Sequence, residues 1–299
     1  MGRLTIPAKS KTASRRLGVL VLCASFGGLP LQSFAQGSAG PAKIVVPLGA
    51  SGLVENPCPP RPPAPIARLG EPGRPAAYAS PEVLAAYQAY GAWRLANDWA
   101  YLCRYRDENR SLPRSGRPRV VFMGDSITEF WKAYDPDFFA GGILDRGISG
   151  QTTPQMVVRF YQDVVSLRPR IVHIMAGTND VAANTGPTSD DQFKNNITAM
   201  VDLAKANGIK VVLASIPPTK RFSWRPELRP AGKIRELNAW LRTFAASRGA
   251  TYVDYYAVLA DAEGGLKPEY TSDGVHPATA GYAVMKAQAE RALAVAERR

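Results

Sequence analysis

From residue 118 onward the sequence alternates short apolar runs with longer amphipathic stretches, and this alternation restricts the fold more than any other feature. Each apolar run has the length of one buried strand, and the stretches between them repeat apolar residues at helical spacing. Buried strands separated by helices are typical of a parallel sheet that helices cover. The sequence therefore predicts an α/β fold with five strands, at residues 119–123, 142–145, 171–175, 210–214 and 251–254.

The amphipathic stretches predict the covering helices. Thr153-Pro154 provides a cap for the first of them, and Gly208 and Gly249 follow the next two. A last helix is predicted over residues 278–295. The apolar faces of the first three helices consist of Val157, Phe160 and Val164, of Phe193, Ile197, Met200, Val201 and Ala204, and of Ile234, Leu237, Leu241 and Phe244. This pattern is sufficient for one core, so residues 118–299 are predicted to form a single domain.

Residues 36–117 lie outside this pattern and are predicted to form an N-terminal extension. Eight prolines between residues 56 and 75 exclude a continuous helix or an inner strand, which leaves an extended arm. Ser80-Pro81-Glu82 then begins a helix, continuous or broken, that is predicted to run to about Arg106. Its apolar side chains are interpreted as a packing face rather than an aromatic binding surface: Leu84, Tyr87, Leu95, Trp99 and Leu102.

Residues 1–35 are typical of an export signal. Five basic residues precede a largely apolar stretch at 17–31, and Ser33-Phe34-Ala35 provides a cleavage site before Gln36. We expect a mature protein that begins near Gln36, has no stable membrane anchor and resides in the periplasm or outside the cell. Ser14-Arg15-Arg16 leaves both the general and the twin-arginine export routes open.

The charge and the cysteines narrow the class of protein further. The formal net charge is +12, and loss of the five basic residues of the signal lowers it by five, to +7. Basic residues do not alternate with aromatic ones, so we expect a solvated basic surface and no nucleic-acid partner, while an acidic glycan or a lipid headgroup stays open. Cys58 and Cys103 remain after signal removal and are predicted to form a disulfide. Because cysteine and histidine clusters are absent from the sequence, we expect no metal and no cofactor.

Chemically useful residues follow the predicted strands. Gly124-Asp125-Ser126 follows the first strand, a glycine-containing loop that ends at Gly150 follows the second, and Gly177-Thr178-Asn179-Asp180 follows the third. The chain has two histidines, and one of them, His276, comes three residues after Asp273. The carboxyl ends of parallel strands meet at one edge, so a hydroxyl, a base, a carboxylate and amide donors are all available there.

In this order the four segments resemble the SGNH hydrolases, which are also called the GDSL esterase and lipase family. The resemblance spans residues 118–295 and implies a three-layer α/β/α sandwich with a central, mainly parallel five-stranded sheet of the flavodoxin-like SGNH type. Asp145 departs from it, since many relatives have asparagine there. The resemblance rests on Gly124-Asp125-Ser126-Ile127-Thr128, Gly147-Ile148-Ser149-Gly150, Gly177-Thr178-Asn179-Asp180 and Asp273-Gly274-Val275-His276-Pro277.

The resemblance also implies a role for each site residue. Ser126 is the expected nucleophile, His276 the general base and then acid, and Asp273 the carboxylate that orients it. The backbone N–H groups of Ser126 and Gly150 and the side-chain amide of Asn179 are the expected oxyanion hole. The second histidine, His173, lies inside an apolar run and is interpreted as a core residue. The absence of a G-x-S-x-G motif around the serine argues against an α/β-hydrolase.

The substrate is less constrained than the chemistry. Trp131 and Trp224 are interpreted either as substrate-binding residues or as ordinary packing residues. The absence of a long apolar loop favours short acyl esters, such as acetyl groups on a carbohydrate, over lipid. A lysophospholipase or thioesterase acting on lipid acyl groups, and a glycan- or lipid-binding module without turnover, remain the alternatives. The sequence does not determine the oligomeric state.

Overall fold

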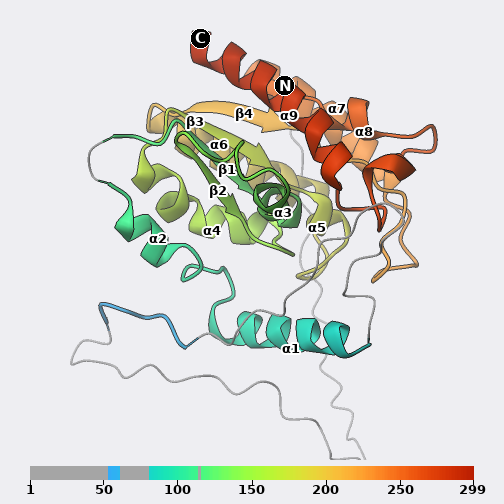
Figure 1. The fold of residues 1–299 in the computed structure, drawn as a ribbon, viewed down its shortest axis with the longest axis horizontal. Coiled ribbons are helices and arrows are strands. Elements are labelled where there is room, and N and C mark those ends of the chain that lie inside the picture. Colours follow the sequence, from blue (N-terminus) through green and yellow to red (C-terminus); the bar gives the residue numbers. More distant parts are fainter. Residues whose placement is uncertain (1–52, 61–80, 114–115) are drawn as a thin grey trace, which may run out of the picture. The chain divides into compact units, whose positions relative to one another are not determined.

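A parallel five-stranded sheet, with helices on both faces, organises the protein (Figure 1). The structure is a computed structural model that describes residues 53–60, 81–113 and 116–299. The predicted signal at residues 1–35 and most of the predicted proline-rich arm lie outside these ranges. The strands are β1 (Val120–Gly124), β2 (Ile143–Gly147), β3 (Ile171–Met175), β4 (Lys210–Ala214) and β5 (Thr251–Val253), close to the five predicted positions.

The strand order is β2-β1-β3-β4-β5, and every neighbouring pair is parallel. The chain moves from β1 outward to β2 and then returns across β1 to β3. This reversal creates a switch point at the carboxyl ends of β1 and β3, where open α/β sheets bind their ligands. The predicted three-layer α/β/α fold is confirmed.

Two of the helices that cover the sheet begin at a capping box. In α4 and α6, a side chain at the cap and a glutamine three residues later bond to each other's backbone, as in a capping box. The helices are α1 (Pro81–Asn97), α2 (Arg106–Ser111), α3 (Ser126–Tyr134), α4 (Thr153–Asp163), α5 (Thr178–Val181), α6 (Asp190–Ala206), α7 (Ala231–Ser247), α8 (Tyr255–Leu259) and α9 (Thr279–Arg298), with 3₁₀ turns at Val165–Leu167 and Pro268–Tyr270.

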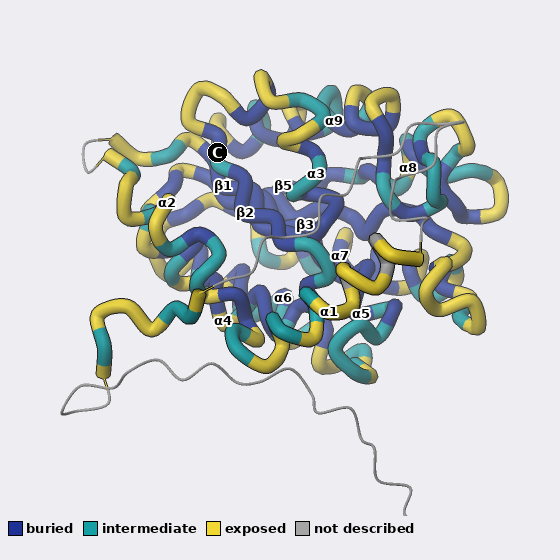
Figure 2. The backbone as a smooth tube through the Cα atoms, turned by 60° about the horizontal axis from the view of Figure 1, so that its bottom comes forward, coloured by how far each residue is buried: buried dark blue, intermediate teal, exposed yellow. Residues whose placement is uncertain are grey.

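The alternation of side chains along each strand divides the core into two layers. In β1, Val121 and Met123 pack against residues of α4, α6 and α7, whereas Val120 and Phe122 pack with residues of α3, α8 and α9. This is the period of two that a strand imposes. Burial is therefore greatest along the strands, which are dark blue in the centre of Figure 2. Burying both faces fixes the register of the sheet, and with it the strand ends that carry the site.

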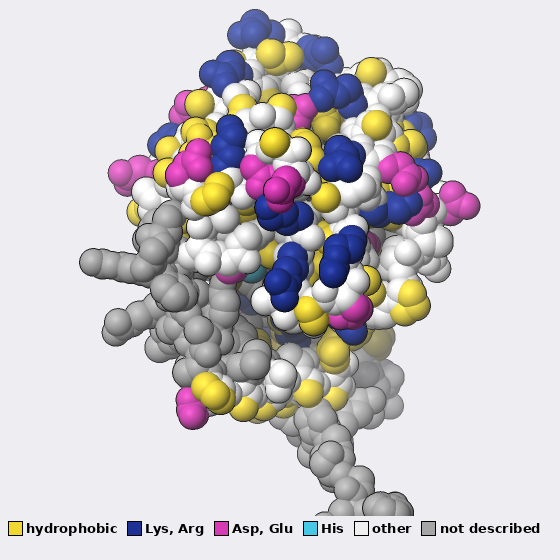
Figure 3. Space-filling model, turned by 90° about the vertical axis from the view of Figure 1, so that its right-hand side faces the viewer, with side chains coloured by type: hydrophobic (Ala, Val, Ile, Leu, Met, Phe, Trp, Pro, Cys, Tyr) yellow, Lys and Arg dark blue, Asp and Glu magenta, His cyan; other side chains and the backbone are white. Residues whose placement is uncertain are grey.

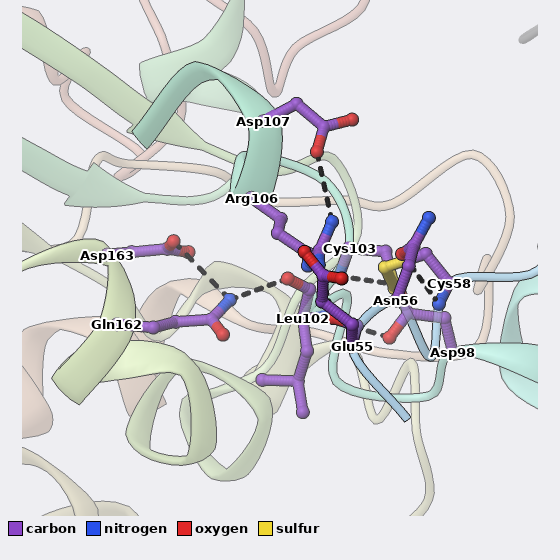
Figure 4. The surroundings of a disulfide bond; sticks show 10 residues. All are labelled: Glu55, Asn56, Cys58, Asp98, Leu102, Cys103, Arg106, Asp107, Gln162 and Asp163. Atoms are coloured by element: carbon purple, nitrogen blue, oxygen red, sulfur yellow. Dashed lines mark hydrogen bonds and ion pairs between the residues drawn. A yellow bond between two sulfur atoms is a disulfide. The ribbon is translucent and has the colours of Figure 1, made fainter. Parts of the chain in front are cut away.

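The N-terminal extension contains two helices rather than one. The helix predicted to reach about Arg106 ends at Asn97, because the Asp98 carboxylate accepts hydrogen bonds from the backbone N–H groups of Leu102 and Cys103 and turns the chain. The predicted disulfide between Cys58 and Cys103 is present in this turn (Figure 4). Gln162 Nε2 of α4 donates to Leu102 O at 2.7 Å, so the turn is also attached to the catalytic domain.

Lysine and arginine side chains are dispersed over the described surface. On the face drawn in Figure 3 they are interspersed with aspartate and glutamate and form no continuous stripe. Nine basic residues of the described part, among them Lys220, Lys233 and Arg242, take part in ion pairs with carboxylates at the surface or partly buried. Exposed pairs of this kind contribute little to stability, so these residues serve chiefly to keep the surface hydrated.

Candidate active site

Ser126 is held at the carboxyl end of β1 by the start of α3. It is the first residue of that helix, and the preceding Asp125 is the cap, whose carboxylate accepts from Ile127 N at 2.9 Å. Ser126 is 8% exposed. The sharp change from strand to helix thus presents the Ser126 hydroxyl at the switch point of the sheet while most of the residue is buried.

His276 meets Ser126 from the other end of the sequence. Its Nε2 lies 2.9 Å from Ser126 Oγ, and its Nδ1 lies 2.7 Å from Asp273 Oδ2. The other oxygen of Asp273 accepts from the backbone N–H groups of Val275 and His276, each at 2.8 Å. These bonds hold the carboxylate in the turn, so that one imidazole nitrogen faces the acid and the other faces the hydroxyl. The three residues therefore have the hydrogen-bond order that nucleophilic catalysis by serine requires.

The side-chain amide of Asn179 lies beside the residue before the serine. Asn179 is in α5, directly after β3, and its Nδ2 donates to Asp125 Oδ2 at 3.1 Å. Its Oδ1 accepts from Asn184 Nδ2 at 2.6 Å. Because the oxygen is occupied by Asn184, the amide cannot flip without losing both bonds. One N–H of Asn179 therefore points to Asp125, and the second stays available as a donor.

The loop after β2 brings Gly150 to the same edge of the sheet. Gly150 has φ +78°, a left-handed conformation that favours glycine. The neighbouring Ser149 donates through its backbone N–H and its hydroxyl to Glu129 Oε2, at 2.8 and 2.6 Å. Glu129 Oε1 in turn accepts from Arg104 of the extension at 3.2 Å. The loop that carries Gly150 is thus attached to α3 on one side and to the extension on the other.

A buried polar network supports the strand ends beneath this loop. Arg159 of α4 is fully buried, and its Nη2 donates to Gly124 O and to Arg146 O, at 3.0 and 2.8 Å. Its Nη1 pairs with Asp163 at 3.1 Å, and its Nε donates to Gln151. Arg159 thereby ties the ends of β1 and β2 together. Its spacing of four residues from Asp163 is the one sequence signal that indicates this pair.

Burial raises the pKa of three carboxyl groups near the site. Loss of hydration raises the pKa of Asp125 to about 6, against the opposing effects of the Ile127 N–H and of His276. Burial also raises the pKa of Asp180, which binds Thr153, to about 6. Asp145 is affected most: burial and the nearby Glu129 raise its pKa to about 7 although it accepts from Gly147 N. Below these pH values the acids hold a proton, which weakens them as acceptors.

The two tryptophans occupy different environments. Trp131 is 0% exposed and stacks on Phe138 within the core, so the interpretation of Trp131 as a substrate-binding residue is wrong. The helical face that carries it points inward because α3 must cover the sheet. Trp224 is 43% exposed, and its Nε1 donates to Asn184 Oδ1 at 2.9 Å. Trp224 therefore stays a candidate for substrate contact, and Asn184 joins it to Asn179.

His173 lies in the core, as its apolar neighbours predict. It is 0% exposed, stacks on Phe122 with ring centroids 4.3 Å apart, and its Nε2 lies 2.9 Å from Tyr255 Oη. Burial lowers the pKa of His173 to about 3, so it is neutral at physiological pH. Of the two histidines, His276 is thus the one whose ring contacts a serine.

Within the described ranges, histidine, cysteine, aspartate and glutamate side chains form no group of three with metal-binding geometry. Among the helices that the structure describes, none has the length and apolar character needed to cross a lipid bilayer.

Comparison with known proteins agrees with this geometry. The signature of the GDSL-like lipase/acylhydrolase family matches residues 122–284, which include all four segments of the site. The chain belongs to the GDSL-like lipase/acylhydrolase family. A GDSL-like lipase from Bacteroides thetaiotaomicron is 45% identical, covers 67% of this chain and 100% of its own, and superposes with a TM-score of 0.65. A candidate acylhydrolase from Bacteroides fragilis is 46% identical, with 66% and 98% coverage and a TM-score of 0.64.

Two further relatives match shorter parts of the chain. Esterase TesA of Pseudomonas aeruginosa is 26% identical over 138 residues, which are 46% of this chain and 62% of that protein. The uncharacterized lipoprotein YqeF of Bacillus subtilis is 37% identical over 79 residues, 25% of this chain and 32% of that protein. The chain thus spans less than two thirds of the length of either relative. These matches do not determine the substrate.

Proposed function

We propose that this protein is a serine esterase that hydrolyses carboxylic esters through an acyl-enzyme intermediate. The observation that carries the proposal is the continuous hydrogen-bonded series from Ser126 Oγ through His276 to Asp273. Membership of an acylhydrolase family supports it. A glycan- or lipid-binding module has no need for this alignment of hydroxyl, imidazole and carboxylate.

In the first half of the reaction, Ser126 Oγ attacks the carbonyl carbon while its proton passes to His276 Nε2. Asp273 accepts the hydrogen bond from Nδ1–H and stabilises the imidazolium. The C–O bond to the alcohol then breaks, and His276 gives the proton to the departing oxygen. In the second half, water attacks the acyl carbon on Ser126 as His276 takes a proton from it. The bond between the acyl carbon and Ser126 Oγ then breaks, His276 returns the proton to Oγ, and the carboxylic acid leaves.

The oxyanion that forms on the carbonyl oxygen is assigned three donors. They are the backbone N–H groups of Ser126 and Gly150 and the second N–H of Asn179. One N–H of the Asn179 amide donates to Asp125, and the amide oxygen accepts from Asn184. These two bonds fix the amide and support the assignment of its second N–H. Donors fixed in advance stabilise the tetrahedral intermediate more than the planar ester, and this difference accelerates the reaction.

For the substrate, we propose short acyl groups on a carbohydrate. Trp224 supports a sugar: its ring is 43% exposed, and it is hydrogen-bonded to the residue that holds Asn179. Aromatic rings of this kind stack on apolar faces of ligands. Lipid acyl hydrolysis is the second candidate, which the lipase-like relatives favour.

We also propose export to the periplasm or the exterior, on the basis of the predicted signal at residues 1–35, and no nucleic-acid partner.

Hydrolysis of 4-nitrophenyl acetate, butyrate and octanoate by the wild type and by Ser126→Ala tests the proposal. We expect Ser126-dependent turnover that is fastest with acetate, and release of acetate from acetylated xylan or pectin. Equal background rates from both proteins would favour the binding module instead. A preference for octanoate would favour the lipid hydrolase. Amino-terminal sequencing of protein recovered from the periplasm tests export, with Gln36 near the expected start.

A further inference from the structure

Helix α1 brings an arginine to the loop that contains Gly150. Arg94, in the last turn of α1, donates from Nη1 to Ser149 O at 2.9 Å. Its Nη2 lies 3.4 Å from the position that a Cβ on Gly150 would occupy. Gly150 is one of the three proposed oxyanion donors. The guanidinium of Arg94 therefore lies next to the place where the carbonyl of the ester is proposed to bind.

The carboxylates near the Arg94 guanidinium already accept hydrogen bonds from other groups. Tyr90, Glu129 and Asp98 are near enough to favour the cation. The oxygens of Glu129 already bond to Arg104 and to Ser149. Those of Asp98 accept from the backbone N–H groups of Leu102 and Cys103. Burial lowers the pKa of Arg94 to about 10, so it remains cationic at neutral pH. Arg94 thus brings a positive charge to the loop that contains Gly150.

Two polar atoms at this position also have no partner among the described residues. Arg94 Nε and Tyr101 Oη are both buried without a hydrogen bond. The two side chains are in contact, with Arg94 Cζ 4.0 Å from the centroid of the Tyr101 ring. Tyr101 itself adopts φ +57°, an uncommon conformation for a residue with a side chain. Buried polar groups are usually paired, so two adjacent unpaired groups indicate a binding function.

We propose that Arg94, with Tyr101 beneath it, forms a subsite for a carboxylate carried by the ester substrate close to the scissile bond. Guanidinium groups bind carboxylates through charged, directional hydrogen bonds. The inference rests on the proposed esterase function and specifies it: the substrate is an ester of an acidic molecule, such as an acylated sugar acid. Helix α1 lies outside residues 122–284, so the selectivity would be a property of this chain's extension.

Pairs of substrates that differ only in charge test the proposal. On the alcohol side we choose 3- and 4-acetoxybenzoate with their carboxamide twins. On the acyl side we choose the 4-nitrophenyl half-ester of adipic acid with its amide twin. For each pair, the ratio of kcat/KM for the acid to kcat/KM for the amide is measured. We expect the wild type to prefer the acid in at least one pair, by about fivefold at low salt and less at high salt.

The variants separate recognition from packing. Arg94→Gln should reduce the acid-to-amide ratio by about fivefold, and Arg94→Lys should retain part of it. Arg248→Gln removes the same charge beyond the end of α7, before β5, and should leave the ratio as in the wild type. If Arg94→Gln slows acid and amide equally, Arg94 only anchors the loop and the proposal is wrong. A ratio near one in the wild type for every pair would also overturn it.

The same assay separates this inference from the proposed function. Turnover of the neutral amides that Ser126→Ala abolishes supports the esterase whatever the acid-to-amide ratio is. No Ser126-dependent turnover of any substrate would contradict the esterase itself. Different results of the same assay therefore contradict the carboxylate subsite and the esterase function.

Discussion

The two halves of the site are held in place by different means. The acid–base half consists of Ser126, His276 and Asp273, and the partners of Asp273 lie within its own turn. The proposed oxyanion half includes Gly150 and Asn179, which depend on residues far away in the sequence: Arg94 for the Gly150 loop and Asp125 for Asn179. A short motif can thus position a proton relay, whereas donors on separate loops need support from separate elements.

Breaking the acid–base half should have the largest effect. Asp273→Asn removes the acceptor that orients the imidazole, and we expect kcat/KM to fall by a factor on the order of 10⁴. Steady-state kinetics with 4-nitrophenyl acetate measure this, and circular dichroism confirms that the variant is folded. A loss of less than about tenfold would mean that Asp273 does not orient His276.

Removing a donor from the oxyanion half should have the next largest effect. Asn179→Ala deletes one of the three assigned donors, and we expect kcat to fall by a factor on the order of 100 to 1,000. KM should change much less, because the donor acts mainly in the transition state. Turnover at the wild-type rate would remove Asn179 from the oxyanion hole.

The charge state of Asp145 offers a test through stability. Burial raises its pKa from 3.8 to about 7, so the folded state favours the protonated acid. The resulting stability is fully present below about pH 4 and is lost as the pH rises through about 7. Asp145→Asn should therefore raise the free energy of unfolding by about 2 kcal/mol at pH 8 and have little effect at pH 4. Urea unfolding at both pH values measures this difference. A gain of the same size at both would contradict the burial argument.

Replacing Asn184 should have the smallest effect on catalysis, and this effect should depend on Asn179. Asn184 Nδ2 donates to Asn179 Oδ1 and so positions the Asn179 amide. Asn184→Ala should therefore lower kcat by about tenfold with a smaller change in KM. The control is the same change in an Asn179→Ala background, where it should have almost no further effect. Independent, multiplicative losses would show that Asn184 acts through something other than Asn179.

The same contrast explains what the sequence could predict. The five strands were predictable because buried strands between amphipathic helices leave a clear pattern, and the four motifs bring Ser126, Asp273, His276, Gly150 and Asn179 to one edge. Asn184, Arg94 and Arg159 were missed because their contacts join residues far apart or lie outside any motif. The sequence leaves Trp131 open between substrate contact and packing, because periodicity alone does not tell which face of α3 is buried; its burial decides for packing. Motifs report local geometry, and the support around them depends on tertiary packing.

The most direct test of the central claim is covalent labelling of the serine. An organophosphate such as diethyl 4-nitrophenyl phosphate reacts with a serine only when a neighbouring base activates it. Peptide mapping by mass spectrometry should place one diethylphosphoryl group on Ser126 in the wild type, and labelling of His276→Ala should be slower by a factor on the order of 100 or more. Labelling at another residue, or at the same rate in His276→Ala, would contradict the account.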